Sequence, residues 1–96
     1  MNDKQAELLS KLTSATVAAY DAEIDTAVSI EEARRLLGEA WDASEQARIN
    51  GVSLDDINQT NAAAFWQFLS KHGLKRETYF DMLQNSRSRE IRGASL

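Results

Sequence analysis

Proline is absent from this chain, and glycine occurs only four times in 96 residues. Sheets and long loops normally rely on both residues at their turns, because glycine tolerates positive φ angles and proline fixes φ. Long helices need neither residue in their interior. The sequence therefore predicts an all-α fold.

The length of the chain permits one modest hydrophobic core. With 43% hydrophobic and 27% charged residues, 96 residues suffice for a single small domain and are too few for two. We expect this helical domain to cover residues 1–92 and to be followed by a frayed C-terminal tail at 93–96. The apolar runs are far shorter than the roughly 20 residues that span a bilayer, so we expect no membrane partner.

Apolar residues recur at helical spacing in four segments, and recognisable cap residues mark several of their boundaries. The predicted helices cover residues 3–20, 29–50, 53–72 and 75–91. The segment 21–28 has no glycine or proline, and we interpret it as a connection, either a loop or a continuation of the first helix. The result is a helical bundle-like domain of about four helices.

Three short patterns support these boundaries. Ser29 begins the sequence Ser-Ile-Glu-Glu, which is typical of a capping box in which Glu32 reaches back to the N–H of Ser29. Ser53 precedes two acidic residues and gives a second helix start. Gly73 followed by Leu74 is typical of a helix C-cap with its hydrophobic latch.

Most of the aromatic residues lie in the third and fourth predicted helices. They are Phe65, Trp66, Phe68, Tyr79 and Phe80. We therefore expect the C-terminal helix hairpin to be the main core of the domain.

The helix over 29–50 carries alanine where a robust core would carry leucine. Ala33, Ala40 and Ala47 repeat at heptad spacing, and Leu37 and Trp41 lie on the same helical face. Heptad-spaced alanines indicate a close approach to another helix, either the first helix of the same chain or a helix of a second copy. We expect a homodimer in which these five residues form the dimer face.

The charge is divided unevenly along the chain. Residues 1–70 carry five basic and twelve acidic side chains, whereas residues 71–96 carry six basic and three acidic ones. Such a division favours binding to a charged partner or head-to-tail pairing of two copies.

The residues that catalysis commonly requires are largely missing. Without cysteine there is no disulfide, thiolate metal site or cysteine nucleophile, and a reducing, cytoplasmic setting is expected. His72 is the only histidine, which excludes a serine triad and a multi-histidine zinc site. We expect no enzymatic activity, no cofactor and no metal, a structural or capping role for His72, and a partly wet position for Asn61 at the edge of an apolar face.

Residues 68–83 resemble the helix-turn-helix pattern of DNA-binding proteins. The segment has an apolar helix end, then Gly73 and Leu74 at the turn, and then a second helix with apolar residues at the expected spacing. This resemblance implies a DNA-binding regulator that uses the helices 53–72 and 75–91. On the outward face of the second helix, however, Phe80 and its acidic neighbours are better suited to a protein than to DNA.

Arg76 and Arg87 are eleven residues apart and would lie on one side of a continuous helix, next to Phe80. Arginines that frame an aromatic side chain are typical of protein-binding surfaces. Together with Lys75 and Trp66, these residues form the candidate partner-binding surface. We expect a small non-enzymatic regulatory or adaptor protein that binds another protein, and we keep the DNA-binding regulator as the alternative.

Overall fold

The structure is a computed structural model that describes residues 1–93. Residues 94–96, the larger part of the expected C-terminal tail, lie outside the described residues. The elements are five helices: α1 (Asp3–Ile24), α2 (Ile30–Ile49), α3 (Leu54–His72), α4 (Arg76–Met82) and α5 (Ser86–Arg92). The predicted all-α fold is thus confirmed, and the part of the chain that the structure describes contains no strand.

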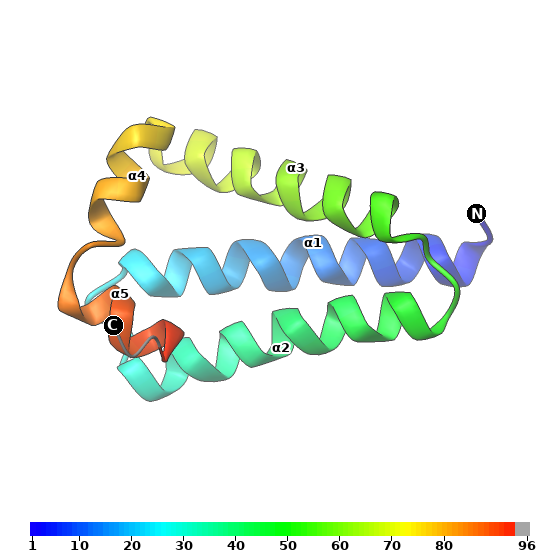
Figure 1. The fold of residues 1–96 in the computed structure, drawn as a ribbon, viewed down its shortest axis with the longest axis horizontal. Coiled ribbons are helices and arrows are strands. Elements are labelled where there is room, and N and C mark those ends of the chain that lie inside the picture. The colour runs from blue at the N-terminus through cyan, green and yellow to red at the C-terminus, as the bar shows by residue number, and fades with distance from the viewer. Residues whose placement is uncertain (94–96) are drawn as a thin grey trace.

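Helix α1 lies between α2 and α3 and packs against both (Figure 1). Helices α2 and α3 make few contacts with each other, because they diverge from the loop that joins them. The short helices α4 and α5 close the end of the bundle where α1 ends (Figure 1). Among residues 1–93, no helix combines the length and the hydropathy needed to cross a membrane.

The core consists of three clusters, and α1 contributes to each of them. Leu12 is fully buried in the first cluster, and Ala22 lies in the second, against residues of α2 and α5. The third cluster contains Phe68 and Tyr79, which are closed over by Tyr20 of α1. The C-terminal hairpin therefore contributes the aromatic cluster, as expected, but it is not the main core on its own.

The cap residues behave largely as predicted. The side chains of Ser29 and Ser53 accept hydrogen bonds from backbone N–H groups in the first turns of α2 and α3. Gly73 ends α3 with a φ of 61°, and the N–H of Leu74 donates to the carbonyl of Leu69 at 2.9 Å. The reciprocal half of the predicted capping box is absent from α2, where the carboxylate of Glu32 pairs with Arg35 instead.

The connection predicted over 21–28 is half helix and half loop. Helix α1 continues to Ile24, because Ala22 and Glu23 are buried and Ile24 packs against the aromatic cluster. The loop begins at Asp25, whose side chain accepts a hydrogen bond from the N–H of Ala27 at 3.0 Å. Such an Asx turn competes with helix continuation and explains where α1 ends.

The helix predicted over 75–91 does not form as one helix. It breaks after Met82, and Asn85 caps a new helix by accepting a hydrogen bond from the N–H of Ser88 at 2.8 Å. The break lets Tyr79 pack in the aromatic cluster while Ile91 packs against Ala33. A continuous helix would hold these two side chains about 120° apart and would not bury both against α1.

The alanines of the predicted dimer face are buried inside the chain, which corrects that interpretation. Ala33 and Ala47 have no exposed surface, and Ala40 is 6% exposed. Their small side chains allow α2 to lie close to α1, so the intramolecular alternative holds for them. Leu37 and Trp41 of the same predicted face remain accessible.

A buried ionic group joins α1 to the C-terminal helices. Glu23 is 4% exposed, and its carboxylate accepts hydrogen bonds from the Tyr79 hydroxyl (2.6 Å) and from Arg92 Nε and Nη2 (2.6 and 3.1 Å). The pKa of Tyr79 is raised above its ordinary value, first by burial of its ring and then by the Glu23 carboxylate beside its hydroxyl. The hydroxyl therefore stays a donor. A buried carboxylate with these partners avoids the large cost of an unpaired charge.

Arg87 holds the loop between α1 and α2. Its Nη2 lies 3.2 Å from the carbonyl oxygen of Ala22, 2.9 Å from that of Asp25 and 2.5 Å from that of Val28. These carbonyls include groups that the end of α1 leaves without helical partners. Arg87 therefore acts as a C-terminal cap for α1 that comes from a distant part of the chain.

Asp21 connects the end of α1 to the end of α3. Its carboxylate lies 2.6 Å from Lys71 Nζ and 2.7 Å from His72 Nε2. Partial burial acts to raise the pKa of Asp21, but the hydrogen bonds and charges of Lys71 and His72 outweigh it, so this pKa lies below its ordinary value. His72, whose ring also lies against Phe68, thus occupies a structural position, as predicted.

We expect the Arg87→Met variant to have a free energy of unfolding about 1–3 kcal/mol lower than that of the wild type, because it leaves carbonyls at the end of α1 without donors. Arg89→Met is the matched control, since Arg89 is exposed on the same helix, and it should change stability by about 0.5 kcal/mol or less. Urea denaturation followed by circular dichroism measures both values. Equal losses for the two variants would contradict the capping role of Arg87.

Asp21→Asn should destabilise the protein at pH 7 by about 0.5–1 kcal/mol, the upper part of the range for exposed ion pairs, because Asp21 is partly buried. Because the pKa of Asp21 is lowered by folding, the contribution is present above the unfolded pKa and is lost as the pH falls through the folded value. The difference between variant and wild type should therefore shrink below about pH 4. A difference that stays constant from pH 7 to pH 3 in urea denaturation would refute this assignment.

Candidate protein-binding groove

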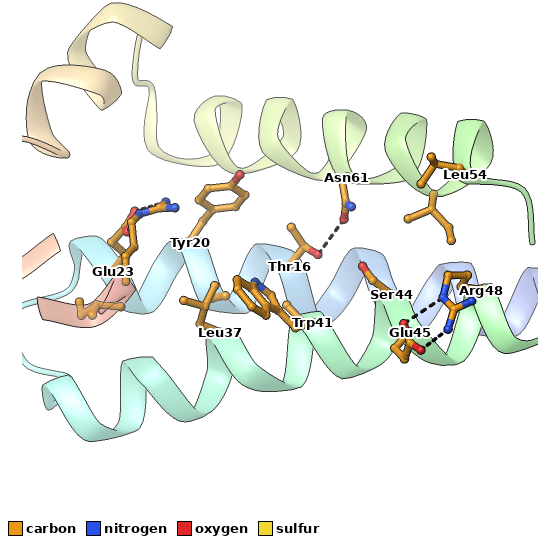
Figure 2. Close-up of a pocket in the computed structure, with 15 residues that line it drawn as sticks. Thr16, Tyr20, Glu23, Leu37, Trp41, Ser44, Glu45, Arg48, Leu54 and Asn61 are labelled. Atoms are coloured by element: carbon orange, nitrogen blue, oxygen red, sulfur yellow. Dashed lines mark hydrogen bonds and ion pairs between the residues drawn. The ribbon is translucent and has the colours of Figure 1, made fainter. Parts of the chain in front are cut away.

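A groove of about 480 Å³ runs between α2 and α3, with α1 as its floor (Figure 2). It exists because α2 and α3 both pack against α1 and diverge from each other. Glu23, with Arg92 of α5 bonded to it, lines one end, and Arg48 with Leu54 lines the other. On α2 the lining extends from Leu37 to Arg48, a rise of about 17 Å.

The walls of the groove carry large apolar side chains that are open to solvent. Trp41 of α2 is 72% exposed and Leu54 of α3 is 67% exposed, and both line the groove. Leu37 of α2 is half-buried beside Trp41, and Tyr20 of α1 is half-buried on the floor (Figure 2). Exposed apolar side chains that gather along one groove, rather than singly, mark a binding surface.

A short polar strip crosses the middle of the groove. Thr16 Oγ1 of α1 donates a hydrogen bond to Asn61 Oδ1 of α3 at 3.3 Å, and Ser44 of α2 lies in the same lining (Figure 2). Asn61 is half-buried at the edge of the apolar face of α3, as predicted. Its amide nitrogen carries two N–H groups, which can donate hydrogen bonds to a polar side chain of a partner in the groove.

The charged groups of the lining are paired within the chain. At one end the Glu23 carboxylate is bonded to Arg92, and at the other Glu45 pairs with Arg48 on the surface of α2 (Figure 2). Burial tends to lower the pKa of Arg92, but its bonds to Glu23 outweigh burial and raise it. The lining is therefore apolar and balanced in charge, although the chain as a whole is acidic.

The predicted partner-binding surface is assembled only in part. Arg76 lies over the Phe80 ring at 5.3 Å, and Phe65 links Phe80 (6.2 Å) to Trp66 (5.9 Å), so these side chains gather in one exposed aromatic patch. Lys75 is exposed next to them at the start of α4.

Arg87 does not belong to this patch, because the break between α4 and α5 turns its guanidinium toward the α1–α2 loop. The same break affects the DNA-binding alternative, which uses a continuous helix over 75–91. In the structure α4 has only seven residues, and Phe80 on it is 44% exposed beneath Arg76.

The groove was not predicted from the sequence, although several of its residues were. Leu37 and Trp41 were predicted to lie on a dimer face, whereas no binding role was predicted for Leu54 or Tyr20. Leu54 directly follows the helix cap Ser53, and side chains in a first helical turn often remain exposed, which was the available signal. Divergence of α2 and α3 depends on packing against α1 and has no local signature.

Residues 1–93 bring together no group of three or more histidine, cysteine, aspartate or glutamate side chains that could hold a metal ion. The lining of the groove offers apolar side chains and a few hydrogen-bonding groups, among them Thr16, Ser44 and Asn61. Comparison with protein-family models, with curated proteins and with solved structures finds no match for this chain.

Proposed function

We propose that this protein is a non-enzymatic adaptor or regulator that binds an amphipathic helix of another protein in the groove between α2 and α3. The observation that carries the proposal is the pair of exposed apolar walls, Trp41 at 72% and Leu54 at 67%, above a floor formed by α1. A fourth helix in this position would convert the three long helices into a four-helix bundle. Grooves of this kind recognise the apolar face of a helix.

The exposure of the walls favours a helix over a small ligand. A volume of about 480 Å³ also falls in the range of small-molecule sites, but such sites bury 70–90% or more of the ligand. Walls whose side chains are themselves two-thirds exposed do not enclose a compact molecule. An amphipathic helix needs only one stripe to be buried and keeps its polar face in water.

The dimensions and the charge of the groove define its occupant. The lining on α2 accommodates about three turns of helix, which present apolar side chains at positions such as i, i+3 or i+4, and i+7. Each large apolar side chain that becomes buried contributes roughly 1.5–3 kcal/mol before the costs of association. Because the charges of the lining are paired internally, we expect an uncharged buried face, with one serine, threonine or asparagine opposite Asn61.

The probe for this proposal is a displayed library of 15-residue helical peptides. The peptides have an alanine, glutamate and lysine scaffold, and five positions on one face are randomised. Selection on the wild-type protein should enrich peptides with apolar residues at the spacing given above. In fluorescence anisotropy the selected peptides should bind with micromolar Kd, and Leu37→Lys or Leu54→Lys should weaken binding at least tenfold, because each places a charge in the apolar wall.

Ile49→Lys provides the matched control. Ile49 is an exposed apolar residue of α2 outside the groove lining, so the same chemical change there should alter the peptide Kd by less than twofold. Selection that enriches no peptide, or peptides that bind the wall variants as tightly as the wild type, would overturn the proposal. Binding to a random DNA duplex at low salt that the wall variants leave unchanged would favour the DNA-binding alternative instead.

A further inference from the structure

Helix α2 carries a second pattern on the side away from its buried alanines. Six residues recur at alternating spacings of three and four, which places them along one stripe of the helix. All six are exposed. This α2 stripe consists of Glu31, Arg34, Gly38, Trp41, Glu45 and Arg48.

The α2 stripe is complementary to itself when two copies run antiparallel. In antiparallel coiled coils, residues at the same distance from the midpoint face each other across the pair. With the midpoint between Glu39 and Ala40, every charged residue of the stripe faces one of opposite sign. The facing residues are Glu31 and Arg48, Arg34 and Glu45, and Gly38 and Trp41, and each contact occurs twice.

Gly38 gives independent support, because its own chain does not explain it. Glycine in the interior of a helix is destabilising relative to alanine. Its φ is not positive, and a Cβ built on Gly38 would meet nothing within 4 Å among the described residues. The missing side chain does leave room for the indole of a Trp41 that approaches from outside, and Trp41 is 72% exposed.

We propose that two copies of this protein associate through the α2 stripe, with the two α2 helices antiparallel and Trp41 of each copy packed over Gly38 of the other. This inference goes beyond the binding of a partner helix, because it assigns a second copy of the chain to α2, on a stripe that shares Trp41, Glu45 and Arg48 with the edge of the groove. It also replaces the alanine face as the site of dimerisation, since those alanines are buried against α1.

The present contacts of the charged residues are compatible with the pairing. Glu45 and Arg48 form an exposed pair within α2, and such pairs are weak and exchange partners readily. Arg34 donates one hydrogen bond, from Nε to the carbonyl of Glu90 at 2.7 Å. A guanidinium has five N–H donors, so this bond leaves others for the carboxylate of a second copy.

One pair of helices of this length forms a small interface. Interfaces below about 1,200 Å² are typical of weak association, so we expect a dimer Kd of roughly 10–100 μM. Sedimentation equilibrium from 5 μM to 1 mM protein covers this range. The expected result is a shift from the monomer mass of 10.7 kDa to twice that value as the concentration rises.

Two substitutions test the Gly38–Trp41 contact. Gly38→Leu introduces a good helix former in α2 but fills the space for the indole, and Trp41→Ala removes the indole, so each should raise the dimer Kd at least tenfold. A protein that stays monomeric at 1 mM, or a dimer that neither substitution weakens, would overturn the proposal. Thermal unfolding at concentrations below the Kd confirms that the variants fold.

A charge exchange tests the register. Glu31→Lys and Arg48→Glu each place like charges opposite one another and should weaken the dimer at least threefold, whereas the double variant restores opposite charges and should recover the wild-type Kd within about twofold. Glu39→Lys, the same change outside the stripe, is the matched control and should leave the Kd unchanged. Failure of the double variant to recover would refute this register.

The orientation has its own measurement. The chain has no cysteine, so Glu39→Cys and Asp42→Cys each provide a unique site for a spin label outside the α2 stripe. In the antiparallel register, labels at position 39 lie about 1.5 Å apart along the helix axes, and labels at position 42 lie about 8 Å apart along them. A third label from Asn50→Cys should give a separation of about 30 Å along the axes, and a short distance there would indicate a parallel pair and overturn the proposal.

These outcomes are distinct from those of the peptide experiment. If the groove binds helical peptides but the protein is monomeric, the helix-binding function stands and the dimer fails. If the dimer forms through the α2 stripe and no peptide is selected, the reverse conclusion holds.

Discussion

The close packing of α2 against α1 is the constraint on which the rest of the structure depends. On the α2 side of α1 the contacts are made by small residues, including the fully buried Ala33 and Ala47, so the two helices lie close together. On the α3 side, the C-terminal half of α1 meets the rings of Phe65 and Phe68 through Tyr20. The distance between packed helices follows the size of the side chains between them. Because α2 packs closely on one side of α1, and aromatic rings fill the space between α1 and α3 on the other, α2 and α3 are held apart. The groove is the space left between them.

The same asymmetry explains why the C-terminal segment is broken. The end of α1 has to be covered on both sides: by Tyr79 where it meets α3, and by Ile91 where it meets α2. One straight helix cannot place both side chains in these positions, and Asn85 supplies the cap that starts α5 in a new direction. The buried group of Glu23, Tyr79 and Arg92 then joins the three elements that meet there. Polar bonds in this place specify a single arrangement of short helices that have little core of their own.

Most of the local structure was predictable from the sequence, because it is encoded in neighbouring residues. The scarcity of glycine and proline predicted the all-α class, and Ser29, Ser53 and Gly73 predicted three helix ends correctly. The cap at Asn85 is also encoded by neighbouring residues. It was not predicted, because apolar residues continue at helical spacing on both sides of it. The three buried alanines of α2 show what the sequence alone does not determine. Their spacing correctly indicated a close helix contact, but spacing alone does not distinguish α1 of the same chain from a second copy.

The groove and the α2 stripe differ from these local features, because both are formed largely by residues whose side chains the core of the domain does not use. Helix α2 packs its alanine face against α1, and its remaining surface serves both proposals, because Trp41, Glu45 and Arg48 line the groove and also belong to the α2 stripe. A dimer through the α2 stripe would carry two grooves on one pair of helices, with Trp41, Glu45 and Arg48 at the edge that each groove shares with the dimer contact. A partner with two helical segments would then bind the second groove at an effective concentration set by the linker between the segments, often in the millimolar range. Weak single contacts of the size expected for a three-turn helix would thereby combine into stable binding, and the weakness of the dimer itself would make that binding depend on the concentration of the adaptor.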